Sequence, residues 1–286
     1  MISLPTSTSR PIDDYTTTMI GNKRLSEDAI RHRLLEGILL RLARLPDAAH
    51  FILRGGMLMR LWFRPCFRPA GDLDLVSTLP FSVEETARRF VPLLADRGVD
   101  DGVSFDSERF RVEGIWLNTA FPGVRLFVRG EVEGVEDDAS VDVTFGEPLI
   151  PKPELGEYPM RGGELTVSLW MCRPETIVGR KLHALMHMGM FHWRAKDLND
   201  LRLLLSRVPM NFADLPAAIA ASFTSRGNTT ADARSLFGRE WWSLKMSAAR
   251  WQDFIEESKE TDVPRKLACV VAEVAERLAP ILERLP

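Results

Sequence analysis

The chain has 286 residues, a length that favours about two domains on a prior of roughly 150 residues each. With 45% hydrophobic and 27% charged residues it can bury a core, which excludes a disordered chain. A net charge of −3 excludes a uniformly basic nucleic-acid coat protein, and three widely separated cysteines argue against a disulfide scaffold or a zinc finger. No apolar run approaches about 18 residues and no signal-peptide pattern opens the chain, so we expect a soluble, cytoplasmic protein that does not enter a membrane.

The first 170 residues mix helical and strand signals. Residues 1–18, rich in Ser, Thr and Pro, predict a loose arm. Further on, apolar residues recur at helical spacing in some segments and alternate with polar residues in others. The elements expected here are a helix after Ser26, a short strand at 50–53, a helix over 57–63, a strand at 72–76, a helix over 81–97, a small sheet within 103–145 and a strand at 164–170.

Strand signals vanish after Pro174, a residue that suits the first turn of a helix. The helices expected in this second part cover 174–190, 197–206, 213–223, 234–258 and 264–284. We therefore predict an α/β fold. An α/β domain takes residues 1–170, and an all-helical C-terminal domain takes residues 171–286.

The pair Gly55-Gly56 stands between a predicted strand and a predicted helix. Such a turn leaves backbone N–H groups free at a helix start, where they can bind phosphate. Asp72 and Asp74 follow, two residues apart on a predicted strand, so both point to one face. Neighbouring carboxylates repel each other unless a cation lies between them, and Mg²⁺ suits that place. The alternative is a solvated strand face with a plain glycine turn.

A third carboxylate, Asp142, lies between Val141 and Val143 in another β-rich run. An acid in such a run is disfavoured unless it faces water or a ligand. A neighbouring strand would bring it beside Asp72 and Asp74, giving a three-acid metal site. An exposed position on an edge strand is the alternative.

Lys181 interrupts the apolar stripe of the helix predicted over 174–190. An ammonium in that position needs an anion, for which a triphosphate is one candidate, unless the side chain snorkels to solvent. Asp197 and Asp200 share one side of the next helix. Helix capping and compensation of the helix dipole would explain these two acids without a function.

Two basic segments, residues 51–71 and 176–196, contain no acid between their arginines and lysines. They flank the proposed carboxylates and would form a funnel for a nucleoside triphosphate and a polynucleotide end. Ordinary ion pairs elsewhere in the fold are the alternative. The basic residues are Arg54, Arg60, Arg64, Arg68, Arg180, Lys181, Arg194 and Lys196.

Four segments between about residues 51 and 205 resemble the AbiEii/AbiGii-type nucleotidyltransferase toxins of the polymerase-β-like superfamily. They are FILRGGMLMRLW, RPAGDLDLV, VDVTFG and PETIVGRKLHALMHMGMFHWRAKDLNDLRLLL. The resemblance implies a nucleotidyltransferase-like mixed β-sheet domain with flanking helices, followed by an all-helical C-terminal domain. It also implies a Mg²⁺-dependent enzyme that transfers NMP from NTP to RNA, in particular to the 3′ end of tRNA. Such an enzyme would be the toxin of a toxin–antitoxin or phage-defence system and would have a cognate antitoxin.

The resemblance also implies roles for individual residues. We assign nucleotide binding to Gly55, Gly56, Met57, Arg68 and Lys181. We assign catalysis to Asp72, Asp74, Asp142, Lys181 and Asp197, with the first three holding two Mg²⁺ ions. Asp142 is in addition a candidate general base for the attacking 3′-hydroxyl.

Two positions depart from the family pattern. Met57 stands where a Ser or Thr is common, so no hydroxyl can donate to phosphate there. Lys196 replaces an arginine before Asp197, which keeps the charge but loses the bidentate fork. These departures leave two alternatives open: a catalytically weakened nucleotide- or RNA-binding protein of the same fold, or nucleotidyl transfer to a protein or a small molecule.

Overall fold

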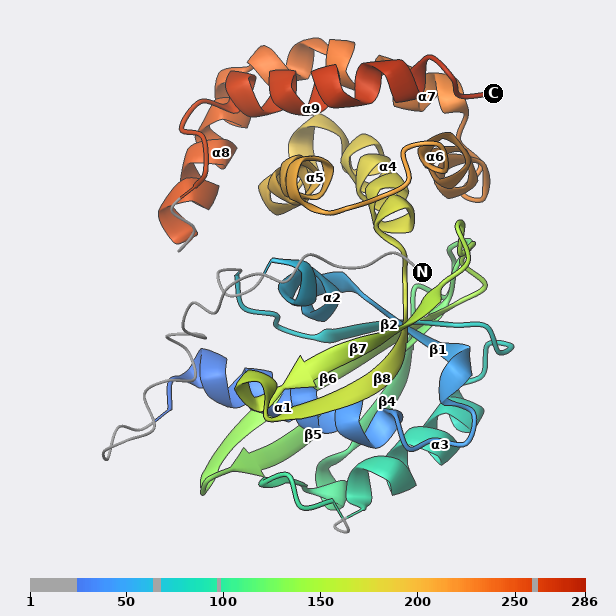
Figure 1. Cartoon of the computed structure of the whole chain (residues 1–286), viewed down its shortest axis with the longest axis vertical. Helices are drawn as coiled ribbons and strands as arrows, with labels where there is room; N and C mark the ends of the chain where they lie inside the picture. The colour runs from blue at the N-terminus through green and yellow to red at the C-terminus, as the bar shows by residue number, and fades with distance from the viewer. Residues whose placement is uncertain (1–24, 64–67, 97–98, 259–261) are drawn as a thin grey trace.

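The computed structural model describes residues 25–63, 68–96, 99–258 and 262–286 (Figure 1). The predicted arm, residues 1–18, lies outside the described residues. The strands are β1 (Phe51–Arg54), β2 (Leu73–Ser77), β3 (Val103–Phe105), β4 (Arg111–Ile115), β5 (Gly123–Val132), β6 (Val135–Phe145), β7 (Glu154–Met160) and β8 (Leu165–Met171). The helices are α1 (Glu27–Leu42), α2 (Gly55–Trp62), α3 (Val83–Ala95), α4 (Pro174–His192), α5 (Ala195–Arg207), α6 (Leu215–Thr224), α7 (Thr230–Ser235), α8 (Lys245–Glu257) and α9 (Leu267–Leu282).

The strands of the described residues form one mixed sheet in the order β3-β5-β6-β2-β1-β8-β7, with β4 paired to β5. β2 and β6 run parallel, as do β1 and β8, whereas β1–β2 and β5–β6 are antiparallel. Ser26 caps the first helix and accepts a hydrogen bond from the Ala29 backbone N–H, as its position before two acids predicts. The predicted α/β fold is confirmed.

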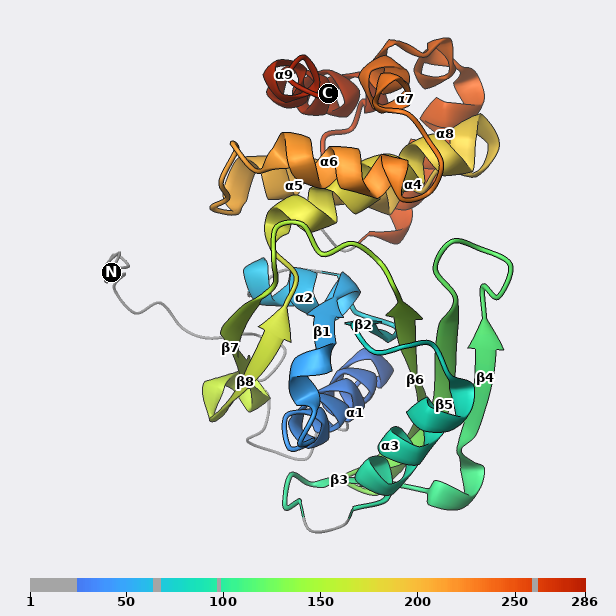
Figure 2. The same cartoon turned by 90° about the vertical axis from the view of Figure 1, so that its right-hand side faces the viewer.

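Helices α1 and α3 cover the same face of the sheet (Figure 2). Leu34 of α1 lies against Gly130 of β5, and Val83 of α3 lies against Gly114 of β4. Because Gly114 pairs with Val124, an even number of residues before Gly130 on β5, the two glycines face the same side. The opposite face carries the polar groups of the candidate site.

The part after β8 is helical throughout its described residues. Its helices lie above the sheet in Figure 1, with α9 outermost and packed on α5 and α6. α4 and α6 approach closely because Gly179 has no side chain: a Cβ there would lie 2.6 Å from the Ala218 carbonyl oxygen. The apolar face of α9 is buried within the chain. Buried apolar residues of both parts form one cluster, and the division into domains at residue 170 stays a prediction.

Two details of the prediction are wrong. The single helix expected over 234–258 is broken between α7 and α8 by two short 3₁₀ turns. Trp241 and Trp242 lie in this break and pack into the core, where the Trp242 indole N–H donates to the Leu236 carbonyl at 2.8 Å. Strand β7 was not predicted because its sequence, ELGEYPM, contains Gly and Pro and has mostly exposed residues at its start. It pairs along one side with β8, as an edge strand.

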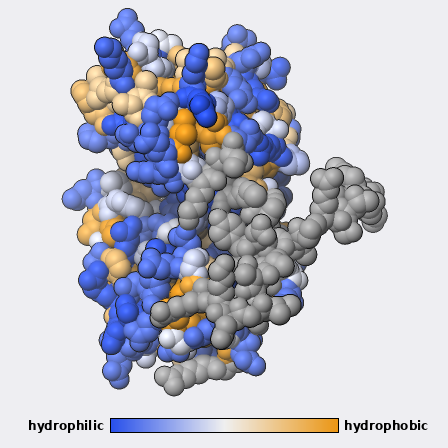
Figure 3. Space-filling view, turned by 90° about the vertical axis from the view of Figure 1, so that its left-hand side faces the viewer, coloured by the Kyte–Doolittle hydropathy of each residue, from blue (hydrophilic) through white to orange (hydrophobic). Residues whose placement is uncertain are grey.

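Within the described ranges, no helix combines the length and the apolar composition needed to cross a membrane. Hydrophilic residues cover most of the coloured surface in Figure 3, with apolar residues in small groups between them.

Candidate active site

Three carboxylates lie together on the open face of the sheet. The parallel ladder between β2 and β6 pairs Asp74 with Asp142, so their side chains stand on the same face. Asp72 precedes β2 by one residue. Burial raises the pKa of Asp72, and the charges of Asp74 and Asp142 raise it further. The structure therefore brings the three acids together, whereas their role as metal ligands stays a prediction.

The three acids differ in their partners. Arg125 of β5 donates two hydrogen bonds to the Asp142 carboxylate, of 2.6 Å from Nε and 2.5 Å from Nη2. The Asp142 side chain is 3% exposed. Asp74 is held more loosely: its Oδ1 lies 3.5 Å from Arg54 Nη1, and 22% of its side chain is exposed. Asp74 thus offers its oxygens to a ligand more readily than Asp142 does.

The glycine pair fits closely against Asp74. Gly55 has a φ of +69°, and a Cβ on it would lie 2.0 Å from Asp74 Oδ2. Only glycine allows the first turn of α2 to approach the carboxylate at this distance. The Met57 side chain is turned into the core with 0% exposure, and its carbonyl accepts a hydrogen bond from the Tyr158 hydroxyl. Any contact of residue 57 with phosphate would therefore come from its backbone N–H.

A second group of charges lies between α4 and α5. Lys181 Nζ is 2.8 Å from Asp197 Oδ1 and 2.6 Å from Asp200 Oδ2, and Arg68 Nη2 lies 3.1 Å from the same Asp200 oxygen. Burial opposes the charge on Lys181, but Asp197 and Asp200 outweigh it and raise the pKa of the ammonium. Burial likewise acts against ionisation of Asp197, whose pKa is nevertheless lowered, chiefly by Lys181. The anion that Lys181 was predicted to need is supplied within the chain.

Electrostatic effects link the two groups of charges. The charge of Lys196, at the start of α5, acts to lower the pKa of Asp72. The charges of Asp74 and Asp197 both act to raise the pKa of Arg180 of α4, against the effect of burial. The sheet carboxylates and the start of α5 thus face the same region. Of the predicted residues, Asp72, Asp74, Asp142, Gly55, Gly56, Arg68, Lys181 and Asp197 border it, and the Met57 side chain does not.

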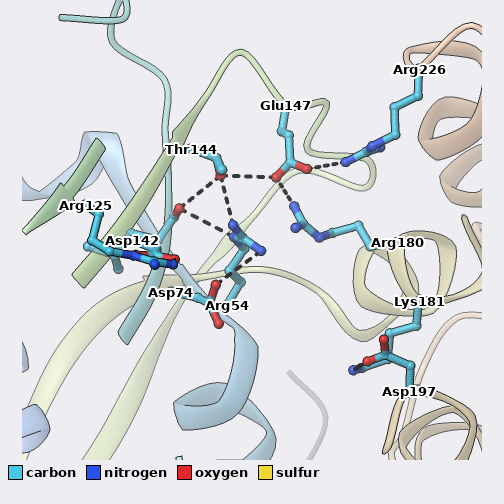
Figure 4. A network of polar contacts seen from close by, with 11 residues as sticks. Arg54, Asp74, Arg125, Asp142, Thr144, Glu147, Arg180, Lys181, Asp197 and Arg226 are labelled. Atoms are coloured by element: carbon cyan, nitrogen blue, oxygen red, sulfur yellow. Dashed lines mark hydrogen bonds and ion pairs between the residues drawn. The ribbon is translucent and has the colours of Figure 1, made fainter. Parts of the chain in front are cut away.

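A chain of polar contacts connects the sheet to the helical part (Figure 4). Arg54 Nη2 donates to Thr144 Oγ1 at 3.1 Å, and Thr144 Oγ1 donates to Glu147 Oε2 at 3.3 Å. Glu147 in turn accepts hydrogen bonds from Arg180 and Arg226.

Four residues around the site, Arg125, Thr144, Glu147 and Arg226, were not among the predicted site residues. The alternating position of Arg125 in GVRLFVRG and the position of Glu147 directly after VDVTFG were usable signals. Nothing in the sequence around Arg226 indicates its place.

No group of three or more His, Cys, Asp or Glu residues within the described ranges has a spacing that would hold a metal ion on its own. Because Arg125 occupies Asp142, the carboxylates that fit Mg²⁺ are Asp72 and Asp74. Burial is the main cause of the raised pKa of Asp72 and the charge of Asp74 adds to it, and a cation between the two carboxylates would relieve that repulsion. Mg²⁺ is commonly held by one or two carboxylates together with substrate phosphates, and this pair suits that mode.

Solved structures with a similar fold come from H. pylori. One protein, named as a candidate nucleotidyltransferase, aligns with a TM-score of 0.51 at 16% identity over 91% of this chain and 97% of its own. JHP933 from Helicobacter pylori aligns with a TM-score of 0.50 at 16% identity over 92% of this chain and 95% of its own. At such identities the likeness shows the fold alone. No curated protein matches the sequence.

The family model described as nucleotidyl transferase AbiEii toxin, type IV toxin–antitoxin system, matches residues 37–274. This range contains both groups of charges, from Gly55 to Asp200, and most of the helical part. The resemblance found in the sequence motifs is confirmed. The chain belongs to the AbiEii nucleotidyltransferase toxin family and is a nucleotidyltransferase.

Proposed function

We propose that this nucleotidyltransferase transfers NMP from an NTP to an RNA acceptor, the 3′ end of tRNA, with Mg²⁺ held by Asp72 and Asp74. The observation that carries the proposal is the parallel register of β2 and β6, which gathers Asp72, Asp74 and Asp142 opposite the Lys181–Asp197 pair. A cytoplasmic toxin with a cognate antitoxin and a role in phage defence is the biological setting that goes with this proposal.

Each residue has a role that its contacts support. The backbone N–H groups of Gly55 and Gly56, at the start of α2 and beside Asp74, bind the phosphates of the nucleotide. Lys181 uses two of its three N–H donors on Asp197 and Asp200, which fixes the ammonium in place for a phosphate. When bound by Asp72 and Asp74, Mg²⁺ supplies charge neutralisation on the triphosphate and lowers the pKa of the acceptor hydroxyl. A second ion at Asp142 requires Arg125 to release that carboxylate.

The basic segments support an RNA acceptor only in part. Four of the basic residues already form ion pairs with carboxylates of the chain, which agrees with the alternative of ordinary ion pairs. They are Arg54, Arg68, Arg180 and Lys181. Arg194 and Lys196 are exposed at the start of α5, next to Asp197. We assign the contacts with acceptor phosphates to these two residues.

The experiment incubates the purified chain with Mg²⁺, each α-labelled NTP in turn, and total tRNA. A parallel reaction uses the double variant Asp72→Ala/Asp74→Ala, and a third omits tRNA. Label on tRNA with the wild-type chain alone supports the proposal and names the nucleotide. Label on the protein or on a small molecule, label on tRNA with the double variant, or no label with any NTP contradicts it.

A further inference from the structure

We propose that Arg54, Arg180 and Arg226 form a phosphate-binding subsite in which the carboxylate of Glu147 takes the place of the phosphate when no ligand is bound. The inference deepens the proposed function, because it names the groups that receive phosphate oxygens beside the sheet carboxylates. The phosphate belongs either to the polyphosphate of the nucleotide or to the backbone of the acceptor.

Three guanidinium groups from three separate elements converge on this place (Figure 4). Arg54 ends β1, Arg180 lies on α4 and Arg226 follows α6. The Arg54 side chain is 9% exposed, while Arg180 and Arg226 keep 19% and 18% of their side-chain surfaces exposed. The two helix-borne groups are therefore mostly buried and still reach solvent.

The positive charge is only partly balanced. Glu147 serves both Arg180 and Arg226, and Asp74 serves Arg54 at 3.5 Å. Three cations thus face two carboxylates, of which Asp74 is a proposed metal ligand. Burial and the neighbouring arginines lower the pKa of Arg180, and burial followed by Arg54 lowers the pKa of Arg226 to about 10. Burial is the main cause of both shifts and the neighbouring guanidiniums add to it, so an anion bound here would favour the charged forms.

Glu147 has the geometry of an internal stand-in for phosphate. Its two oxygens accept from two different guanidiniums, as neighbouring oxygens of a phosphate do. Arg226 is held in place independently of Glu147, by its hydrogen bond to the Ser222 carbonyl at 2.9 Å and by its position over the Phe121 ring, 4.7 Å from the centroid. Arg226 therefore stays in place when Glu147 yields to a ligand.

The subsite adjoins the candidate active site. Arg54 precedes Gly55, and Arg180 precedes Lys181 along α4. A phosphate held by the three arginines would lie between the sheet carboxylates and the start of α5, since Asp74 and Asp197 both act on Arg180.

The test measures binding of tripolyphosphate to the full chain by calorimetry, at low salt and with EDTA, so that neither metal nor turnover is involved. Because hydrogen bonds to charged groups contribute about 1.5–3 kcal/mol, Arg226→Gln should raise the Kd about tenfold or more. The matched control is Arg250→Gln. Arg250 also donates to backbone carbonyls and lies near an aromatic ring, that of Trp193, but it does not contact Glu147. Its Kd should stay within about twofold of the wild type.

Glu147→Gln gives a result that loss of folding cannot imitate. Removing the competing negative charge should lower the Kd for tripolyphosphate severalfold, whereas a misfolded chain would bind more weakly. A second arm uses a short RNA with a 5′-hydroxyl, which has backbone phosphates only. A loss for Arg226→Gln with tripolyphosphate identifies the nucleotide as the source of the phosphate, and a loss with the RNA alone identifies the acceptor.

Unchanged affinities of Arg226→Gln and Glu147→Gln for both probes would overturn the inference and leave a purely structural ion-pair network. The result is independent of the proposed function. A chain that binds tripolyphosphate through Arg226 but labels no acceptor retains the subsite and contradicts the RNA transfer. If the wild-type chain labels tRNA while Arg226→Gln binds both probes as tightly as the wild type, the proposed RNA transfer stands and the phosphate subsite is contradicted.

Discussion

The sheet carboxylates and the charges between α4 and α5 lie close together but are held in opposite ways. On the helical side, Asp200 is 1% exposed and is met by both Lys181 and Arg68, so two cations face the two acids Asp197 and Asp200. On the sheet, Asp74 is 22% exposed with Arg54 no closer than 3.5 Å, and Asp72 has its pKa raised by burial and by its acidic neighbours.

This difference in charge balance suggests that the helical group contributes mainly to folding and the sheet carboxylates mainly to the reaction. A closed and balanced ion group stabilises the packing of two helices only while each member is present, because an unpaired buried charge is costly. Loosely partnered carboxylates that repel one another make the folded state less stable, and such local cost is found where a ligand supplies the missing charge. We therefore expect substitutions on the sheet to affect transfer most, and substitutions between the helices to affect folding most.

The largest effect is expected for Asp74→Asn. The substitution removes the charge that binds Mg²⁺ but keeps the shape and one oxygen, so nucleotidyl transfer should fall about 10³-fold or more while the thermal midpoint changes little. Labelled-NTP transfer and a thermal melt measure the two quantities. The matched control is Glu113→Gln, an exposed carboxylate on β4 that pairs in register with Arg125. Transfer by Asp74→Asn at the rate of this control would exclude Asp74 from the chemistry.

The next effect is on folding. Lys181→Met leaves Asp197 and Asp200 buried beside each other with one cation fewer, and should lower the free energy of unfolding by about 3–5 kcal/mol. Urea denaturation followed by circular dichroism gives the value. Lys245→Met, at an exposed lysine that begins α8, serves as the control and should change it by less than about 0.5 kcal/mol. A Lys181 variant as stable as this control would show that the helical group is not an architectural element.

Gly55→Ala tests how closely the sheet site is fitted together. The added Cβ would meet Asp74 Oδ2 at 2.0 Å on a backbone with φ of +69°, so Asp74 or the turn must move. We expect transfer to be lost and the free energy of unfolding to fall by about 1–3 kcal/mol. Gly71→Ala is the control, because no atom lies within 4 Å of its added Cβ and its backbone suits alanine. Full transfer by Gly55→Ala would mean that this close approach has no role.

The sequence predicted the sheet side well because its signals are local. The period of two residues places Asp72 and Asp74 on one face, and Ser26 followed by two acids marks the start of α1. The pairing of β2 with β6 is not local, since Asp74 and Asp142 are far apart in the chain. Their shared motif positions in a family that this chain resembles supplied what periodicity does not.

The partners of these acids were beyond the sequence. Arg125 reaches Asp142 through the register of β5 with β6, and Arg226 reaches Glu147 from a helix end that carries no motif. The break between α7 and α8 was missed for a related reason. Trp241 and Trp242 continue a helical periodicity, but packing of these large side chains overrides it.

The smallest effect is expected for Asp72→Asn, which removes a carboxylate whose charge is disfavoured by burial and by repulsion from Asp74 and Asp142. The pKa of Asp72 in the folded chain lies above its ordinary value of 3.8, so the folded state binds this proton more tightly than the unfolded state does. The ionised carboxylate therefore lowers stability at neutral pH, and Asp72→Asn should raise the free energy of unfolding there by up to about 1 kcal/mol. The gain should shrink as the pH falls through the raised pKa, because the wild-type carboxyl then takes up its proton.

Asp232→Asn should have the opposite effect. Hydrogen bonds from Thr229 lower the pKa of Asp232, so the variant should be less stable than the wild type at neutral pH and equally stable in acid. Urea midpoints at pH 7 and in acid compare both variants. A loss of stability at pH 7 for Asp72→Asn would show that the charge of Asp72 stabilises the folded chain. The contrast with the helical side would then disappear.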